Sequence, residues 1–186
     1  MARSQQPSAP DVEVRASHIE GLGLFAARSF SGGETIRTIN VVREITADAP
    51  LRPELGERAD HCDYPDGRVV LIGFPDRHVN HSCDPNAWVR YGEGVCELVA
   101  RRAIPDGVEI TIDYQVNVTG GDAWPCHCGS ERCRGQVVGD FFQLPAAVQR
   151  EYAPLLAGWF VRRHDERLAA LGLVPPTGAV APPRLS

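Results

Sequence analysis

The sequence predicts a mostly β domain that ends in a short helical segment, and three features support this fold class. Short apolar runs recur through most of the chain, separated by turn residues. The 18 glycines and 15 prolines among 186 residues supply many such turns. After residue 139, apolar side chains recur every three or four positions, a spacing typical of amphipathic helices. A chain of this length fits one domain.

Each strand is predicted from alternation of apolar and polar residues, or from a dense apolar run between turns. Val12, Val14 and Ala16 alternate with polar residues and predict a first strand. The turn Gly21-Leu22-Gly23 then leads into a second strand at residues 24–27. The remaining predicted elements are a strand pair within 34–45, an irregular insert at 46–66, a strand at 68–72, a hairpin of 87–91 with 96–101, and a strand at 109–113.

The two ends of the chain differ from this pattern. Residues 1–10 are rich in Ser, Gln, Pro and Ala, which predicts a disordered leader. Residues 139–174 form a helical C-terminal extension of one or two amphipathic helices that pack on their own domain, with Gly172 placed to end the last one. Residues 175–186 are rich in proline and are predicted to be loose.

Charge and composition argue against several classes of function. A net charge of −5 argues against a nucleic-acid partner, which normally meets a basic surface. No secretory signal or membrane-spanning run is visible, so we expect no membrane partner and a cytoplasmic location, or a nuclear one if the source is eukaryotic. Cysteines stay reduced there, so the six cysteines indicate metal binding or burial before disulfides.

Three of the cysteines, Cys126, Cys128 and Cys133, lie within eight residues. Zinc prefers four nitrogen or sulfur ligands, and three thiolates leave one position open. The candidates for that position are His127, Cys62, Cys96 and Cys83. The ring of His127 would tend to point away from a metal that its two neighbours share. The alternative is that the three cysteines are free in a surface loop.

The polar run from Arg77 to Asn86 holds a thiol, two imidazoles, two amides and a hydroxyl. It has too few apolar side chains for a core strand or an amphipathic helix, and its Asp-Pro-Asn sequence predicts a tight, hydrogen-bonded turn.

The run from Gly21 to Ala26 satisfies a dinucleotide-binding fingerprint, which requires a following helix to hold the pyrophosphate. The breaker Ser31-Gly32-Gly33 comes too soon for such a helix. The sequence therefore argues against a dinucleotide-binding fold and leaves a turn that lets a ligand lie close to peptide groups.

Four motifs follow one another along the chain: Gly21-Leu22-Gly23, Asn80-His81-Ser82-Cys83-Asp84-Pro85-Asn86, Glu109-Ile110-Thr111-Ile112-Asp113-Tyr114, and Cys126-x-Cys128-x4-Cys133. In this order they resemble a SET-domain protein lysine methyltransferase with a post-SET zinc-binding segment. The resemblance implies a SET fold of several small sheets with a knot-like C-terminal turn that brings Asn80 and Tyr114 together. It places the SET domain at residues 11–117 and the post-SET segment at 118–138.

The resemblance also implies two bound groups, S-adenosylmethionine and a structural zinc ion. The implied cofactor contacts are Gly21, Leu22, Gly23, Arg77, Asn80, His81, Tyr114 and Trp124. The amide of Asn80 suits the amine and carboxylate of the methionine part, and Trp124 is placed to cover the adenine. The implied zinc ligands are Cys83, Cys126, Cys128 and Cys133. We interpret His81 as scaffold and not as a general base.

Tyr114 is the predicted catalytic residue. Methyl transfer to lysine requires a neutral amine, and a phenol at the end of an apolar channel can hold the reacting groups in line. The alternative is an ordinary strand-end tyrosine with a satisfied hydroxyl. Ile112 stands where many family members have Phe or Tyr, which predicts that more than one methyl can be added. Candidates for the channel wall are Tyr64, Phe74 and Trp88.

The predicted function is transfer of a methyl group from S-adenosylmethionine to a lysine of a protein or peptide substrate, with histones among the candidates. One alternative is a non-catalytic SET-like zinc module that binds a peptide, and another is a small-molecule methyltransferase on the same scaffold. The presence of Gly21, Gly23, Asn80, His81 and Tyr114 favours catalysis, because a binding module would need none of them. The sequence does not name the substrate or the oligomeric state.

Overall fold

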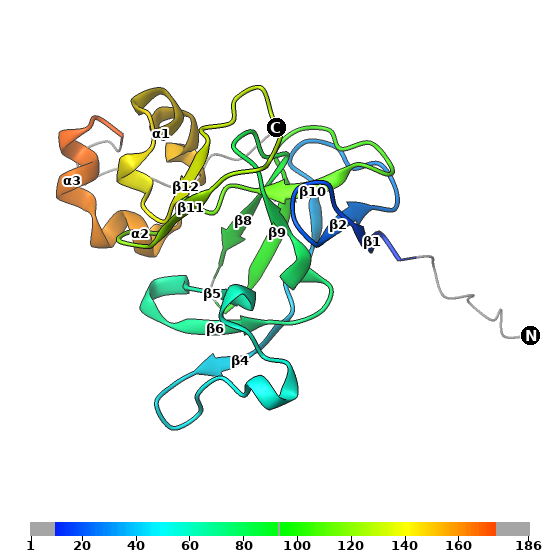
Figure 1. The fold of residues 1–186 in the computed structure, drawn as a ribbon. Coiled ribbons are helices and arrows are strands. Elements are labelled where there is room, and N and C mark those ends of the chain that lie inside the picture. Colours follow the sequence, from blue (N-terminus) through cyan, green and yellow to red (C-terminus); the bar gives the residue numbers. More distant parts are fainter. Residues whose placement is uncertain (1–9, 93, 174–186) are drawn as a thin grey trace, which may run out of the picture.

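The computed structural model describes residues 10–92 and 94–173, and within them the chain is mostly β (Figure 1). Twelve short strands in this part form four small sheets, and three short α-helices follow the last strand. The prediction of a mostly β fold with a helical C-terminal segment is confirmed. The predicted leader, apart from Pro10, and the predicted loose tail at 175–186 lie outside the described residues.

The first sheet has four strands in the order β1-β2-β10-β7. β1 (Val12–Ala16) and β2 (Leu22–Ala26) are antiparallel. Gly21 precedes β2 with φ of 47°, a left-handed conformation that glycine adopts without strain. β10 (Glu109–Ile112) pairs antiparallel with β2 and parallel with β7 (Asn80–His81). Three of the four sequence motifs therefore lie on adjacent strands.

The second sheet has the order β3-β9-β8 and contains the predicted hairpin. Its strands are β3 (Thr35–Thr38), β9 (Cys96–Ala100) and β8 (Ala87–Tyr91). It contributes with the first sheet to the main core, whose buried residues are Val12, Leu24, Ala26, Phe30, Ile36, Ala87, Leu98, Ala100, Ile104 and Ile110. Removal of these side chains from water is the main force that holds the two sheets together.

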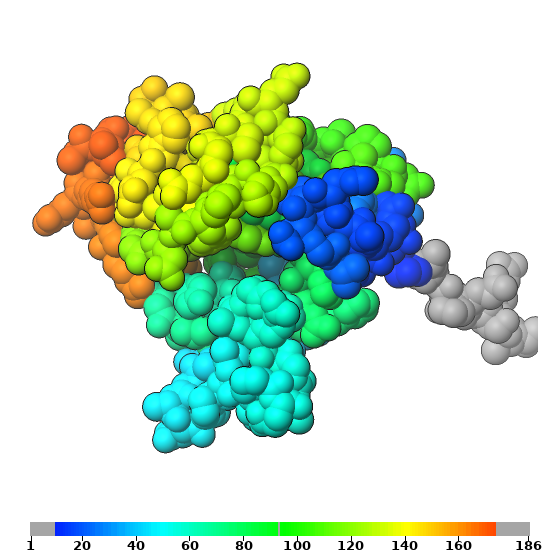
Figure 2. Space-filling model, in the orientation of Figure 1, coloured from blue at the N-terminus to red at the C-terminus, as the bar shows by residue number. Residues whose placement is uncertain are grey.

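The third sheet, in the order β4-β6-β5, projects from the body as a lobe at the bottom of Figures 1 and 2. Its strands are β4 (Val41–Ile45), β6 (Val69–Ile72) and β5 (Cys62–Asp63). The segment between β4 and β6 is otherwise irregular, as predicted, with 3-10 turns at Pro53–Leu55, Ala59–His61 and Pro65–Gly67. A further 3-10 turn, Asp76–His78, precedes β7.

The predicted pairing of the two strands within residues 34–45 is wrong. β3 pairs with β9, whereas β4 pairs with β6. A two-residue hairpin loop needs positive φ angles, and neither Ile39 nor Asn40 adopts one. Asp76 instead fixes the bend, because its carboxylate accepts a hydrogen bond from the Asn40 N–H at 2.8 Å.

Besides β5, which lies in the predicted irregular insert and pairs with β6, two short strand pairings escaped the sequence analysis. β7 lies inside the polar run that was predicted as a turn, and β11 (Ala123–Pro125) pairs with β12 (Gln136–Val138) in the tail after β10. All three residues of β11 are exposed, and its sequence, Ala-Trp-Pro, shows no alternation of apolar and polar residues. Both pairings depend on backbone hydrogen bonds, which side-chain periodicity does not reveal.

The C-terminal segment contains three helices in place of the predicted one or two. They are α1 (Ala146–Tyr152), α2 (Gly158–Arg163) and α3 (Asp165–Ala170), with 3-10 turns at Phe141–Gln143 and Ala153–Leu155. Pro154 lacks the N–H that would continue α1, and His164 leaves the helical conformation between α2 and α3.

Gly172 ends α3, as predicted. Its N–H donates to the Ala169 carbonyl and the Leu173 N–H donates to the Leu168 carbonyl, both at 2.9 Å, which is the Schellman pattern. The helices lie on the opposite side of the molecule from β1 (Figure 1) and enclose a second core, formed by Phe141, Leu144, Tyr152, Ala157, Phe160 and Leu168. None of the helices in the described part of the chain has the length and apolar character needed to span a bilayer.

Candidate functional site

The polar run of residues 77–86 lies along β10 and is hydrogen-bonded to it. β7 runs parallel to this strand, so His81 lies opposite Ile112. Asn86, which is 8% exposed, accepts a hydrogen bond from the Thr111 N–H at 2.9 Å and donates one to the Glu109 carbonyl at 2.8 Å. The run therefore contacts β10 from one end of the strand to the other.

Tyr114 follows β10 and lies beside β7. Its N–H donates to Nδ1 of His81 at 3.2 Å, and its hydroxyl donates to the Val79 carbonyl at 2.7 Å. Burial raises the pKa of the hydroxyl well above its ordinary value, with further contributions from Asp60 and Glu109. The phenol is therefore protonated at neutral pH. Tyr114 as a whole residue is 36% exposed, so it is a partly exposed strand-end tyrosine whose hydroxyl is satisfied by the Val79 carbonyl.

The side chain of Asn80 connects the Gly21–Gly23 turn to β10. Its Nδ2 has three acceptors: the carbonyls of Glu20 and Leu22, both at 3.1 Å, and Oε1 of Glu109 at 2.8 Å. A Cβ atom on residue 23 would lie 2.2 Å from that same Oε1. Gly23 is therefore needed for the Glu109 carboxylate to reach Asn80.

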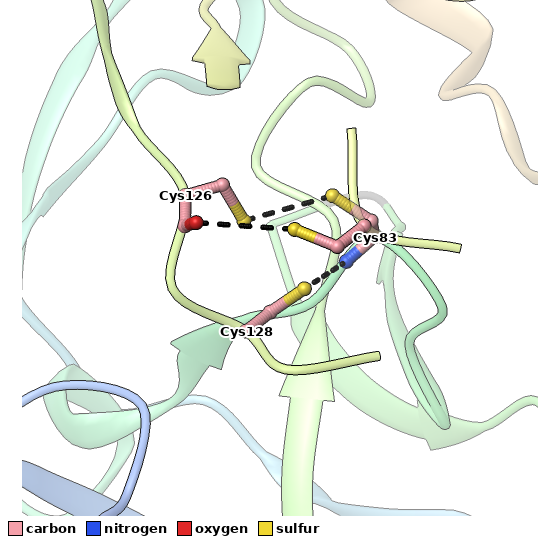
Figure 3. A group of neighbouring side chains, drawn as sticks. Cys83, Cys126 and Cys128 are labelled. Atoms are coloured by element: carbon pink, nitrogen blue, oxygen red, sulfur yellow. Dashed lines mark hydrogen bonds between the residues drawn. The ribbon is translucent and has the colours of Figure 1, made fainter. Parts of the chain in front are cut away.

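Four cysteine sulfurs meet where the segment after β10 (residues 114–138, here called the tail) contacts the polar run of residues 77–86. Figure 3 shows the sulfurs of Cys83, Cys126 and Cys128 pointing toward one another. With the sulfur of Cys133 they lie within 4.8 Å of one another, and Cys83 and Cys126 are 3.7 Å apart. A zinc tetrahedron with Zn–S bonds of about 2.3 Å has edges of about 3.8 Å. The donor set and its spacing fit zinc.

The structure brings only one of the four candidates for the fourth ligand, Cys83, into this cluster. Cys62 lies on the insert, where its thiol contacts the Arg58 carbonyl at 3.7 Å. Cys96 is half-buried at the start of β9. His127 is not part of the cluster.

Backbone N–H groups lie close to three of the sulfurs, where they can donate hydrogen bonds to thiolate ligands. The Arg134 N–H lies 3.3 Å from the Cys83 sulfur, and the Cys83 N–H lies 3.5 Å from the Cys128 sulfur. Burial opposes ionisation of Cys128, but hydrogen bonds from the Cys83 N–H and from Ser130 lower the pKa of this thiol to about 6, whereas burial raises the pKa of the Cys83 and Cys126 thiols. The form that binds zinc is therefore favoured at Cys128 at neutral pH.

Ion pairs attach the tail to its surroundings. Arg134 contacts Asp113 at 2.8 Å, and the two side chains are 14% and 0% exposed. Arg132 contacts Glu151 of α1 at 2.6 Å. Because Asp113 immediately precedes Tyr114, the tail holds the strand end that carries the predicted catalytic residue.

A cavity of about 860 Å³ is bordered by β8, the insert, the tail and α2. Figure 2 shows the surface hollowed between the lobe and the tail. The aromatic residues that line it are Tyr64, Trp88, Tyr91, Tyr114, Trp124, Tyr152, Trp159 and Phe160. The insert adds the carboxyl groups of Asp60 and Asp63. Aromatic faces with nearby carboxyl groups suit a cationic group on an apolar stem.

The structure separates the predicted cofactor and channel residues into two groups. Those that line the cavity are Arg77, Tyr114 and Trp124, together with Ile112 and the channel candidates Tyr64 and Trp88. Those that do not are Gly21, Leu22, Gly23, Asn80 and His81, which lie on β2, β7 and the preceding turn. Phe74 is 59% exposed and also outside the cavity lining, so it does not fit the channel wall.

Several residues of the site were not found by sequence reasoning. Asp63 accepts a hydrogen bond from the Tyr91 hydroxyl at 2.8 Å in the cavity wall, and burial raises the pKa of its carboxyl group. Trp159, predicted to pack on its own domain, also lines the cavity. Arg134 stands directly after Cys133, but nothing in that position signals its partner Asp113.

Comparison with known proteins identifies related chains. A family model described as the SET domain matches residues 21–115, just over half of the chain. The Mus musculus histone-lysine N-methyltransferase SETD2 is 38% identical over 152 residues, which cover 74% of this chain and 6% of that protein. The Homo sapiens histone-lysine N-methyltransferase 2B is 34% identical over 137 residues, 66% of this chain and 5% of that protein. The chain thus spans only a small part of these relatives.

Among solved structures, a candidate histone methyltransferase from Plasmodium falciparum matches with a TM-score of 0.47 and 23% identity, over 57% of this chain and 94% of that chain.

Proposed function

The chain belongs to the SET-domain family, and from this membership we propose that it is an S-adenosylmethionine-dependent protein-lysine N-methyltransferase. The observation that carries the proposal is the position of Tyr114, beside β7 on one side and in the wall of an aromatic cavity on the other. Because relatives are histone-lysine N-methyltransferases, the proposed substrate is a lysine-containing protein, histones included.

The proposed chemistry depends on the protonation and position of Tyr114. S-adenosylmethionine, when bound, supplies a methyl group on a positively charged sulfur, and the lysine amine must be neutral to accept it. The aromatic wall removes water from the lysine stem, which disfavours the charged amine. The Tyr114 hydroxyl donates a hydrogen bond to the Val79 carbonyl, so its oxygen lone pairs remain free to accept a hydrogen bond from an N–H of the amine. This contact would orient the amine for in-line transfer.

We propose that Gly21, Leu22, Gly23, Arg77, Asn80, His81, Tyr114 and Trp124 bind the methyl donor. The donor half of Asn80 is already engaged with Glu109 and two carbonyls, so its Oδ1 is the atom offered to the amine of the methionine part. The carboxylate then needs a different donor. Arg77, which lines the cavity, is the residue proposed for that contact.

Cys83, Cys126, Cys128 and Cys133 are the proposed ligands of a structural zinc ion. The close approach of the four sulfurs supports this assignment. Zinc there would hold the tail against the central run. The proposed location is the cytoplasm, or the nucleus of a eukaryotic cell, where thiols stay reduced.

Ile112 is proposed to permit more than one methyl addition. It lines the cavity two residues before Tyr114, and its aliphatic side chain cannot hold a water molecule in place of a methyl group. We expect mass spectrometry of the product to show dimethyl-lysine or trimethyl-lysine, and Ile112→Tyr to shift the product toward monomethyl-lysine. Monomethyl product alone from the wild type at high turnover would contradict this.

The decisive experiment is labelled methyl transfer from S-adenosylmethionine to core histones and to a cell lysate. Tyr114→Phe is expected to lower kcat/KM about 100-fold, while cofactor affinity, measured by calorimetry, stays near that of the wild type because the substitution keeps the ring and main chain of residue 114 and removes only the hydroxyl. Tyr64→Phe is the matched control, because it removes a hydroxyl from the same cavity but keeps the ring.

The possible outcomes separate the alternatives. Protein labelling that depends on Tyr114 supports the proposal, and the labelled band identifies the substrate. Label in a small-molecule fraction would favour a small-molecule methyltransferase. Absence of both labelling and cofactor binding would favour the peptide-binding zinc module.

A further inference from the structure

His81 lies between the cysteine cluster and Tyr114 and contacts both. Its Nδ1 is 3.2 Å from the Tyr114 nitrogen, and its Nε2 is 3.4 Å from the Cys83 sulfur. The two aromatic rings are 5.4 Å apart between centroids. The residue is 6% exposed, so water does not compete strongly for either nitrogen. Both ring nitrogens therefore have defined partners.

The directions of these two hydrogen bonds follow from the partners. A backbone N–H can only donate, so Nδ1 of His81 is the unprotonated acceptor for Tyr114, and the Asp113 carboxylate, 3.6 Å from Nδ1, lies beyond hydrogen-bond distance. The ring proton then lies on Nε2, which faces the Cys83 sulfur. When a bound metal keeps Cys83 as a thiolate, its sulfur accepts a charge-assisted hydrogen bond from the Nε2–H group. The ring is thus held in one tautomer and one orientation.

We propose that His81 is a positioning residue that couples the cysteine cluster to the main chain of Tyr114. The effect of this coupling on catalysis rests on the proposed function. The structural coupling itself does not, and it can be tested separately. A metal on the cluster fixes the Cys83 sulfur, the sulfur fixes Nε2, and the rigid ring then fixes Nδ1 against the Tyr114 N–H. A ligand-orienting contact of this kind commonly controls metal affinity.

A second path supports the same coupling. The Arg134 N–H lies 3.3 Å from the Cys83 sulfur, and the guanidinium of the same residue contacts Asp113 at 2.8 Å. The two residues at the end of the strand, Asp113 and Tyr114, are therefore each connected to Cys83 by one intermediary. Because a displacement of about 1 Å can cost about 100-fold in rate, such connections would matter for transfer.

Two substitutions test the hydrogen bonds of the two His81 ring nitrogens one at a time. The carbonyl of Asn can replace the acceptor Nδ1, so His81→Asn keeps the bond to Tyr114 and loses the one to Cys83. The amide N–H of Gln can replace Nε2, so His81→Gln keeps the contact with Cys83 and loses the acceptor for Tyr114. His18→Asn, at an exposed position, controls for the substitution itself.

The first readout is release of zinc to a chromophoric chelator, which does not depend on activity. We expect His81→Asn to release zinc about 10-fold faster than wild type and His81→Gln to stay within about 2-fold. The turnover number should fall about 10-fold in His81→Gln, because the hydrogen bond that positions Tyr114 is lost. Equal effects of the two variants on both readouts would overturn the proposal.

The second readout is the amide resonance of Tyr114 in protein labelled with ¹⁵N-tyrosine, which contains only four tyrosines. Tyr114→Phe assigns the signal. Exchanging zinc for cadmium changes the metal–sulfur bonds while keeping thiolate ligation. We expect the exchange to shift the Tyr114 resonance in wild type and to shift it much less in His81→Asn.

The two readouts keep the proposals distinguishable. If the variants fail to fold, the wild-type exchange alone decides, and an unchanged Tyr114 resonance would overturn the coupling. Absence of methyl transfer by the wild type would overturn the proposed function but would leave the zinc and resonance results intact.

Discussion

The two walls of the cavity are held in place by different interactions. The insert wall (residues 59–67) depends on the β5–β6 ladder, with Pro65 as the one buried residue of its two 3-10 turns. The tail wall (residues 114–124) leads into the exposed strand β11 and is followed by the cysteine cluster. Neither wall buries much apolar surface. The insert wall therefore relies on backbone pairing, and the tail wall on buried charge and on the cysteine cluster that is proposed to bind zinc.

Metal removal should affect the two walls most differently. After treatment with a chelator, we expect methyl transfer to fall at least 100-fold, because the tail loses its attachment to the central run. Hydrogen exchange should accelerate in residues 123–138 and remain unchanged in β5 and β6. Readdition of zinc is the control for irreversible damage. Equal protection of the tail with and without metal would show that the cluster does not hold it.

Loss of the buried ion pair in the tail should give the next largest effect. Arg134→Ala leaves the Asp113 carboxylate, which is 0% exposed, without its cation, and we expect a loss of about 3 kcal/mol in the free energy of unfolding. Arg102→Ala is the matched control, because Arg102 is 50% exposed in its pair with Asp84 and should cost less than about 1 kcal/mol. Urea denaturation measures both, and equal losses would contradict the distinction.

Acid should weaken the ion pairs that hold the tail and those that hold the insert. The guanidinium of Arg132, assisted by Arg101, lowers the pKa of Glu151 to about 2, and Arg43 with Arg52 lowers the pKa of Glu57 in the insert to about 2. A carboxylate whose pKa is lowered by folding stabilises the folded state above the unfolded value of 4.5. That stability is lost as the pH falls from 4.5 toward 2.

We therefore expect the unfolding temperature to fall below pH 4.5. Calorimetry between pH 5 and 3 should show a shallower decline for Glu151→Gln and for Glu57→Gln than for wild type. A decline of unchanged steepness in both variants would show that other groups cause it.

The smallest effect is expected where the insert wall contacts α2. Arg163 and Asp66 are 3.0 Å apart, and their side chains are 47% and 53% exposed. Solvent screens such a pair, so Arg163→Gln should change the free energy of unfolding by less than about 1 kcal/mol. A larger loss in urea denaturation would mean that this contact, and not the β5–β6 ladder, holds the insert wall.

Periodicity and motif spacing along the chain predict much of the fold. Val12, Val14 and Ala16 lie in β1, Gly92 and Gly94 lie between β8 and β9, and Ile110 is buried in the core. These features are local, because the alternation of a strand and the conformation of a turn depend on neighbouring residues. The spacing of Cys126, Cys128 and Cys133 is local too, and by itself it indicates a metal site.

Contacts between distant residues could be decided only by the tertiary structure. Local pattern suggested that β3 and β4 pair, but the packing of whole sheets places them apart. The pairing of Arg134 with Asp113, the approach of Glu109 to Gly23, and the choice of Cys83 among four possible ligands have no local signature. Such contacts form because many separate interactions together determine one lowest free energy for the chain, and no short stretch of sequence contains that sum.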